Sequence, residues 1–452
     1  MNYNDLNLIL HQILLNQNTI MTNLNKFIFH FIQIKPIFNK NDFQNLFNNN
    51  FNIINKYNLG IINNLSYNSN NSYIKNHINV CSLKHGKMIE SEYKKLKKLE
   101  KEGQDKIVEN IKLFEDNILL PTYNEISSNN NSEMESLYIT VYYKYKEVKM
   151  SVITKNNLDG TKVEPYGSII NNFMNKKGDI DISIIPNKIK KEEFIKYLKE
   201  IENELIKEKK YAIDNNNSIY VNSRYALLSI KDIESNINID ITVHNLLQII
   251  NSKMIRLYSL FDQRFHIIGS FLKHWVKINN IKGASNGFLS SYALLILIIH
   301  FLQNVVEPKI LPVLQEIRNV NEEYKYFYGE KELSTNIYYV EDFDKAKNYM
   351  NIINNGNQNN LSATELLIQF FEFYAYKYNN LGHYLISIKH REKIFTTNCQ
   401  QIAFPIEDPL DVMHNPGKSL KFNSNQYTEF IFCMKKEINN ILGGDYFKTN
   451  FY

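Results

Sequence analysis

The chain has 452 residues and carries 52 basic against 47 acidic side chains, which gives a formal net charge of +5 at pH 7. Its hydrophobic content of 44% and aromatic content of 13% are typical of a folded protein and exclude a largely disordered one. This length predicts two domains with a substantial core. The three cysteines lack Cys-x-x-Cys spacing, which argues against structural zinc or a disulfide framework and favours a reducing compartment.

Residues 1–85 mix apolar clusters with runs of asparagine, so we expect an Asn-rich N-terminal extension with a low-complexity linker near its end. We expect this extension to be the surface on which a protein partner docks. The stretch 1–38 is nearly free of acids, so a mitochondrial address stays open beside a cytoplasmic or nuclear one. No segment has the roughly 20 apolar residues needed to cross a bilayer, so no membrane association is expected.

Residues 86–156 are predicted to be a helical segment that packs on the core. Two stretches carry apolar side chains at helical intervals, namely Leu96, Leu99, Ile107, Ile111 and Phe114, and then Val141, Tyr145, Val148 and Val152. The many Lys and Glu residues around the first stretch favour a solvated helix over an RNA-binding arm.

Strand and helix patterns then predict a catalytic domain over residues 157–246. Strands are expected at Thr161–Tyr166, Asp179–Ile185, Ser218–Val221, Ala226–Ile230 and Asn238–Val243, with a helix within Lys190–Lys210. This order fits a small mixed sheet with helices on one face. Helical periodicity dominates Leu246–Gln303 and Ser362–Tyr378, so residues 247–452 are predicted to be mostly helical and the fold class is α+β.

Acidic side chains in this sheet indicate a metal site. In the sequence Asp179-Ile180-Asp181 the two carboxylates share one face of a strand, while Ile180 points into the core. Asp240, in a later strand, supplies a third carboxylate, and hard oxygen ligands of this kind suit a pair of Mg²⁺ ions. The preceding Gly167-Ser168 turn can offer backbone N–H groups and a hydroxyl to a phosphate. Together these residues predict a nucleotidyl-transfer site.

This pattern, from about Glu164 to Ser419, resembles the DNA polymerase β-type nucleotidyltransferases. Within that superfamily it is most similar to the terminal uridylyltransferases and the non-canonical poly(A) polymerases. The resemblance implies two lobes, a palm-like catalytic domain and a helical poly(A)-polymerase-associated domain, with a cleft between them. It also implies that Asp179 and Asp181 hold two Mg²⁺ (or Mn²⁺) ions, and that Asp240 binds the ion that activates the RNA 3′-hydroxyl.

The same resemblance implies a nucleotide site made by side chains from several helices. Asn251 would contact the ribose hydroxyls, since an amide can both donate and accept. Lys273 and Lys277, at i and i+4 on one helical face, would bind the β- and γ-phosphates. Ser291 would reach the triphosphate and Tyr292 would stack under the base.

The final motif, Ile406 to Asn415, implies how the base is chosen. His414, six residues after Asp408, falls where uridylyltransferases carry a histidine that adenylating relatives usually lack. An imidazole can hydrogen-bond a uracil carbonyl while it occupies volume that a purine requires. Asp408 would accept from donors in the pocket, and Asp411 would fix the loop or the histidine. Lys418 stands where relatives often have Arg, which puts bidentate contacts there in doubt.

The sequence therefore predicts a template-independent terminal uridylyltransferase that adds UMP from UTP to RNA 3′ ends. Two alternatives stay open: a non-canonical poly(A) polymerase that uses ATP, and a catalytically silent RNA-binding scaffold of the same fold. His414 argues against the first of these, and the intact Asp179, Asp181 and Asp240 argue against the second.

Overall fold

The computed structural model describes residues 98, 101–128, 161–174, 178–185, 193–209, 211–212, 219–221, 226–317, 320–328, 331–378, 384–395 and 401–447. The expected N-terminal extension and the helical face around Val141 lie outside these residues. The elements from Ile107 onward belong to one compact unit. The domain boundaries expected at residues 85, 156 and 246 stay predictions.

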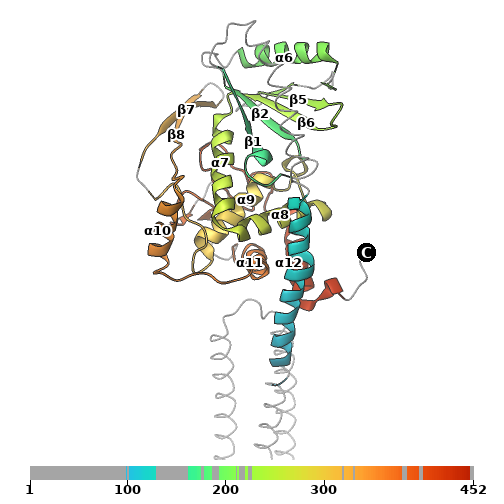
Figure 1. Ribbon diagram of the computed structural model, residues 1–452, viewed down its shortest axis with the longest axis vertical. Coiled ribbons are helices and arrows are strands. Elements are labelled where there is room, and N and C mark those ends of the chain that lie inside the picture. Colours follow the sequence, from blue (N-terminus) through green and yellow to red (C-terminus); the bar gives the residue numbers. More distant parts are fainter. Residues whose placement is uncertain are drawn as a thin grey trace, which may run out of the picture. The chain divides into compact units, whose positions relative to one another are not determined.

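A six-stranded mixed sheet lies between α6, at the top of Figure 1, and the remaining labelled helices below. Its strands are β1 (Lys162–Tyr166), β2 (Ile180–Ile185), β3 (Tyr211–Ala212), β4 (Ile219–Val221), β5 (Ala226–Asp232) and β6 (Asn238–Val243). The order is β1-β2-β6-β5-β3, with β4 also paired to β5. Strands β2 and β6 are parallel, and the other pairs are antiparallel. The five strands expected from sequence all appear, and β3 is an additional short one.

Helix α6 (Phe194–Glu208) covers one face of this sheet. Alternate side chains of β2, β5 and β6 point toward it and form a buried cluster with Leu198, Ile201 and Leu205. The apolar residues at 180, 182 and 184 of β2 are all buried in this way. Because side chains alternate along a strand, the opposite face receives Asp181, Ser183 and their neighbours on β6. One face of the sheet therefore builds the core and the other carries polar groups.

The second part of the unit is a helical core. It contains α4 (Leu120–Ser128), α7 (Leu246–Phe261), α8 (Gln263–Ile278), α9 (Ser291–His300), α10 (Phe343–Ile353), α11 (Ala363–Glu372) and α12 (Asn425–Gly443). Short π-helical turns η2 (Glu115–Leu119), η6 (Phe301–Val305) and η7 (Phe373–Lys377) precede α4 or extend α9 and α11, and 3-10 turns form η3 (Gly167–Ile169), η5 (Ala284–Asn286) and η9 (Asp445–Phe447). In the described part of the chain, no helix combines the length and apolarity needed to cross a membrane.

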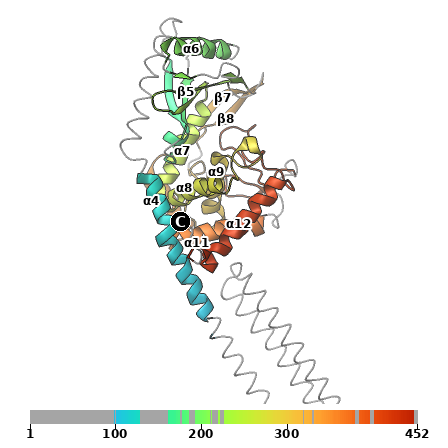
Figure 2. The same cartoon turned by 90° about the vertical axis from the view of Figure 1, so that its right-hand side faces the viewer.

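The packing of these helices confirms the α+β fold class. Helix α9 is apolar on every side and lies inside the core, against α8. The expected contact face of the segment before the sheet is also present, since Phe114 is fully buried and its ring meets that of Phe271 edge-on at 5.8 Å. Figure 2 shows α4 beside α8. Helix α7 contacts β1, β2 and η3, so it joins the helical core to the polar face of the sheet.

Two hairpins complete the described unit. A hairpin of β7 (Glu323–Tyr328) and β8 (Lys331–Asn336) was not expected from the sequence. Its residue Tyr326 packs with Leu247 at the start of α7 and with Leu410 of the final motif. Strands β9 (Tyr384–Leu385) and β10 (Ile394–Phe395) form a second small hairpin. The first hairpin therefore braces the loop in which His414 lies.

Candidate active site

Two of the predicted carboxylates stand side by side in the sheet. Asp181 of β2 and Asp240 of β6 are direct partners on neighbouring parallel strands. Ser229 of β5 lies opposite Asp240, and its hydroxyl donates a hydrogen bond of 2.7 Å to Asp240 Oδ1. All three side chains face away from α6, which gives a polar row across three strands.

Asp179, the third carboxylate, lies just before β2 and is exposed. Its Oδ1 accepts a hydrogen bond of 3.0 Å from Asn238 Nδ2. Since Asn238 precedes Asp240 by two residues, Asp179 lies on the same face as the other two carboxylates. Among the described residues, however, no three Asp, Glu, His or Cys side chains are close enough to form a finished metal site. The carboxylates are therefore neighbours, with Asp179 turned toward an amide.

The electrostatics of this face favour a cation. Burial raises the pKa of Asp181 to about 7, with repulsion from Asp240 and Asp179 adding to the rise and Lys273 opposing it. Burial also raises the pKa of Asp240, while the hydrogen bond from Ser229 opposes that rise and Asp179 adds to it. A divalent cation relieves such crowding, and carboxylate oxygens are the hard ligands that Mg²⁺ and Mn²⁺ prefer. The donor set therefore fits the metal that the sequence predicted.

The Gly-Ser turn lies directly against these carboxylates. Gly167 has a φ of 69°, and a Cβ built on it would stand 2.0 Å from Asp181 Oδ2. Glycine is required here because any side chain would collide with the carboxylate. The Gly167 N–H donates to Ser252 Oγ of α7 over 2.8 Å, and Ser168 follows in the same turn, half-buried.

Only some of the predicted phosphate-binding side chains reach this cluster. Lys273 of α8 is half-buried, and its ammonium group donates to the carbonyl of Phe173. Burial lowers the pKa of Lys273 to about 8, while the nearby Asp181 opposes the change. Lys277 and Ser291 are both exposed, and in the described part of the chain neither makes a hydrogen bond or ion pair to the three carboxylates. At the start of α9 it is Ser290 that caps the helix, by accepting from Ala293 N.

A second cluster is centred on the buried carboxylate of Asp408. Its Oδ1 accepts from Asn251 Nδ2 at 3.3 Å and from the backbone N–H groups of Leu410 and Asp411, each at 3.0 Å. Its Oδ2 accepts from the Tyr292 hydroxyl at 3.2 Å and from His414 Nδ1 at 2.8 Å. Four predicted residues thus meet directly at one carboxylate.

These donors decide the protonation of Asp408. Burial alone would raise the pKa of Asp408, but the hydrogen bond and charge of His414, with the two backbone N–H groups, hold it below its usual value. The rings of Tyr292 and His414 are nearly parallel, with an interplanar angle of 5° and centroids 6.4 Å apart. Asp408 is therefore a fixed anion that orients both rings.

Asp411 holds the loop around this cluster. Its Oδ1 accepts from the Tyr326 hydroxyl of β7 at 3.0 Å and from Met413 N at 3.1 Å. The Tyr326 oxygen also accepts from Val412 N at 3.2 Å. The backbone carbonyl of Asp411 accepts from His414 N at 2.9 Å, whereas Lys418 is exposed.

Neighbouring residues of α7 connect the two clusters. Asn251 donates to Asp408, and Ser252 accepts from Gly167. The distance between the clusters is thus set by one rigid helix. The Oδ1 atom of Asn251 is buried and has no hydrogen-bond partner. The ribose contact that the sequence implied for Asn251 stays a prediction.

Sequence reasoning missed four residues that support these clusters, namely Ser229, Asn238, Ser252 and Tyr326. Ser252 was inside a quoted motif, but its partner Gly167 lies 85 positions away. The strand alternation that places Ser229 opposite Asp240 was a usable signal, because both residues lie in predicted antiparallel strands.

Comparison with known proteins agrees with this geometry. Residues 132–260 match the family model "Poly(A) RNA polymerase, mitochondrial-like, central palm domain". Human terminal uridylyltransferase 7 is 28% identical over 287 residues, which cover 63% of this chain and 18% of that protein. Mouse terminal uridylyltransferase 4 is 32% identical over 221 residues, which cover 47% of this chain and 12% of that protein. The poly(A) RNA polymerase cid11 of Schizosaccharomyces pombe is 26% identical over 237 residues, which cover 52% of this chain and 44% of that protein.

Solved structures define the class of fold. The Cid1 poly(U) polymerase bound to MgGTP superposes with a TM-score of 0.58 at 19% identity, over 71% of this chain and 92% of that one. A cytoplasmic RNA terminal U-transferase gives a TM-score of 0.58 at 19% identity, over 76% and 95% of the two chains. The described part of this chain therefore has the two-domain fold of these solved nucleotidyltransferases. The resemblance of this chain to the terminal uridylyltransferases and non-canonical poly(A) polymerases is thereby confirmed. The chain spans less than half the length of the three relatives named above.

Proposed function

We propose that this chain is an RNA nucleotidyltransferase that adds UMP from UTP to the 3′ end of RNA and releases pyrophosphate. The observation that carries the proposal is the link through α7, in which Asn251 contacts the Asp408 cluster while Ser252 holds the turn against Asp181. A base held beside Tyr292 and His414 then lies a fixed distance from the carboxylates. Such positioning supplies much of the rate enhancement in nucleotidyl transfer.

Asp179, Asp181 and Asp240 are the side chains that would hold two Mg²⁺ (or Mn²⁺) ions. When bound, these ions make the 3′-hydroxyl a better nucleophile and neutralise charge on the pyrophosphate. The sheet brings these three acids together on one face, and Asn238 holds Asp179 by a hydrogen bond. The contact with Asn238 engages only Oδ1 of Asp179, so a carboxylate oxygen remains to act as a ligand.

The phosphates of UTP are assigned to the side chains around the Gly-Ser turn. Lys273 already lies near Asp181, so its ammonium group can balance charge where the α-phosphate and the carboxylates meet. Ser168 offers its hydroxyl from the turn. Lys277 and Ser291 are exposed, which leaves both available to the outer phosphates.

The choice of uracil is assigned to Tyr292 and His414. Because His414 Nδ1 donates to Asp408, Nε2 is the ring nitrogen that remains for a ligand. This nitrogen donates to a uracil carbonyl when the ring carries both protons, and accepts from the uracil N3–H when it is neutral. The buried, unpartnered Oδ1 of Asn251 suits a donor such as the ribose 2′-hydroxyl, which would favour ribonucleotides.

Relatives support both UTP and ATP as substrates. The relatives include proteins named terminal uridylyltransferase and proteins named poly(A) RNA polymerase, and the Cid1 poly(U) polymerase structures are described as revealing a mechanism for UTP selectivity. His414 favours UTP in this chain.

The test is to incubate the chain with Mg²⁺, a labelled RNA primer and each ribonucleotide separately. Extension with UTP in preference to the other three supports the proposal. Preferential use of ATP would reassign the chain as a poly(A) polymerase, and extension with none of the four would favour the silent scaffold.

A further inference from the structure

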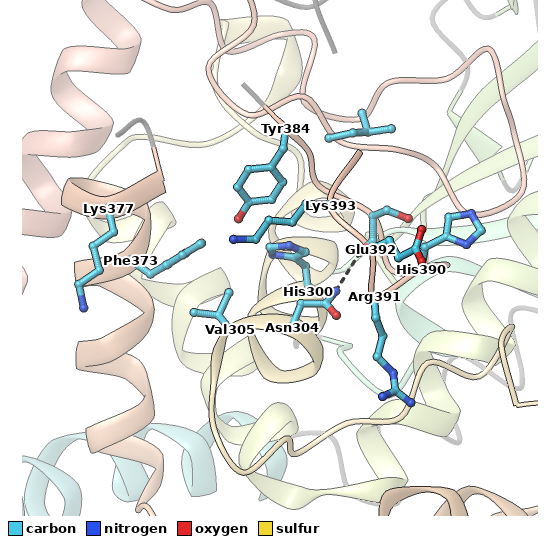
Figure 3. Close-up of a pocket in the computed structure, with 12 residues that line it drawn as sticks. His300, Asn304, Val305, Phe373, Lys377, Tyr384, His390, Arg391, Glu392 and Lys393 are labelled. Atoms are coloured by element: carbon cyan, nitrogen blue, oxygen red, sulfur yellow. Dashed lines mark hydrogen bonds between the residues drawn. The ribbon is translucent and has the colours of Figure 1, made fainter. Parts of the chain in front are cut away.

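A cavity of about 450 Å³ opens in the helical part of the unit, outside the two clusters described above (Figure 3). Its wall comes from the end of α9, from η6 and η7, and from residues 384–393. The lining includes His300, Asn304, Phe373, Lys377, Tyr384 and Lys393. This volume is typical of a small-molecule site, and the lining combines aromatic, cationic and hydrogen-bonding groups.

His300 presents a hydrogen-bond acceptor to this cavity. The Tyr374 hydroxyl donates its single proton to the carbonyl of Leu297 at 2.9 Å. Its oxygen therefore accepts from His300 Nδ1, which lies 2.9 Å away. The proton on Nδ1 leaves Nε2 as an acceptor, and burial, with Lys309 and Lys393, lowers the pKa of His300 to about 3 so that the ring stays neutral.

Asn304, one turn further along, fixes another part of the cavity wall. Its Nδ2 donates to the carbonyl of Ser387 at 3.3 Å, so η6 at the end of α9 is joined to the segment 384–393. Its Oδ1 is buried and closed to a ligand, which leaves His300 Nε2 as the acceptor that the cavity offers.

Cations and aromatic rings stand around His300. Figure 3 shows Lys393 extending between the Tyr384 ring and His300, and its ammonium group lies 5.4 Å from the centre of the Tyr384 ring. Lys377 of η7 also lines the cavity, but its ammonium group points away from His300 (Figure 3). Arg391 is already engaged, because its Nε donates to the Tyr349 hydroxyl at 2.9 Å and lies 3.7 Å from Glu316. Lys393 is therefore the lysine best placed to meet an anion in the cavity.

The cavity wall is joined to the loop that leads to Asp408. Ile386 N donates to the carbonyl of Pro405 at 2.8 Å, and Glu407 N donates to that of Ile386 at 2.9 Å. Lys389 Nζ also lies 3.5 Å from Glu407 Oε1. The segment 386–389 therefore contacts both this cavity and the loop before Asp408, so an RNA strand bound near Asp408 would lie on the other side of that segment from the cavity.

We propose that this cavity binds a nucleotide unit of single-stranded RNA, separately from the UTP site. A planar base stacks on the aromatic wall, one of its N–H groups donates to His300 Nε2, and its phosphate meets Lys393. An anion without N–H or O–H donors would leave His300 Nε2 unpaired. The inference rests on the proposed function only in taking RNA as the substrate.

The experiment measures binding of a short labelled single-stranded RNA to the full chain by fluorescence anisotropy, without any nucleotide triphosphate. The variant Lys393→Ala should weaken binding about fivefold, and the slope of log K against log salt should fall by about 0.7, because one phosphate contact is lost. The matched control is Lys199→Ala on the exposed side of α6, which should change neither quantity. Thermal unfolding checks that both variants are folded.

An unchanged affinity and slope in Lys393→Ala would overturn the proposal. Titration with free UMP separates the two sources of a nucleotide: weaker UMP binding with unchanged RNA binding would assign the cavity to a free nucleotide instead. Photocrosslinking of RNA that carries 4-thiouridine should label residues 373–393, and labelling elsewhere alone counts against the site. If the chain crosslinks there but extends no primer, the RNA site stands while the proposed activity fails.

Discussion

Asp181 and Asp408 are the same side chain in two opposite environments. Asp181 is half-buried beside two other acids, with a pKa raised to about 7 by burial and by repulsion. Asp408 is more deeply buried, yet its pKa is lowered because five hydrogen-bond donors surround it. Burial alone therefore does not decide the behaviour of a carboxylate; the groups that it meets do.

The difference separates two tasks. The crowded acids around Asp181 carry more negative charge than Lys273 balances, and a bound cation or a proton can offset the remainder. Asp408 needs nothing further, and its role is to hold His414, Tyr292 and Asn251 in place. Changing each aspartate to asparagine therefore should have unlike consequences.

The largest effect is expected from Asp181→Asn. Loss of a metal-binding carboxylate should lower primer extension by about a thousandfold or more, while the fold is retained. The assay is the initial rate of primer extension with UTP, and Asp344→Asn, an exposed acid on α10, is the control expected to keep full activity. Activity that survives in Asp181→Asn would place the metal site elsewhere.

Asp408→Asn should instead destabilise the chain. It removes the charge that pairs with His414, and breaking a buried pair costs about 3–5 kcal/mol, to be measured by urea unfolding. The lowered pKa of Asp408 means that its contribution is present above the unfolded value and is lost as pH falls through the folded one. The difference in free energy of unfolding between wild type and Asp408→Asn should therefore become smaller below about pH 4. Equal stability of the two proteins at neutral pH would contradict the Asp408 account.

His414→Ala should have a smaller and more selective effect. Removing the imidazole opens volume for a purine, so the preference for UTP over ATP should fall by about tenfold, a difference of roughly 1.4 kcal/mol. The measurement is kcat/KM for each nucleotide with the same primer. An unchanged ratio removes His414 from the choice of base.

The smallest effect is expected in the absence of metal, where Asp181→Asn should have a higher free energy of unfolding than wild type. Since the folded pKa of Asp181 is raised, the folded chain keeps a proton between about pH 4 and 7 that the unfolded chain has lost, so stability falls as pH rises through this window. Relative to wild type, the variant should gain about 1–2 kcal/mol at pH 8 and little at pH 4. Urea unfolding at both pH values checks the sign, and a variant that is less stable at pH 8 would refute it.

The sequence was sufficient to predict the strands and carboxylates of the site, but not the residues that hold them in position. Period-two alternation predicted β2 and β6 and the shared face of Asp181 and Asp240, because that rule is local. The β7–β8 hairpin was missed, since Tyr, Lys and Glu alternate there without a clear apolar face. Contacts such as Ser252 with Gly167 depend on how α7 crosses the sheet, which no local pattern encodes.

The most direct test of this contrast is thermal unfolding near pH 7.5 with UTP alone and with UTP plus Mg²⁺. Because a ligand that binds only the folded state stabilises it, Mg²⁺ should raise the Tm of wild type and of His414→Ala but not that of Asp181→Asn. A Mg²⁺-dependent rise of equal size in Asp181→Asn would contradict the assignment of the crowded carboxylates as the metal site.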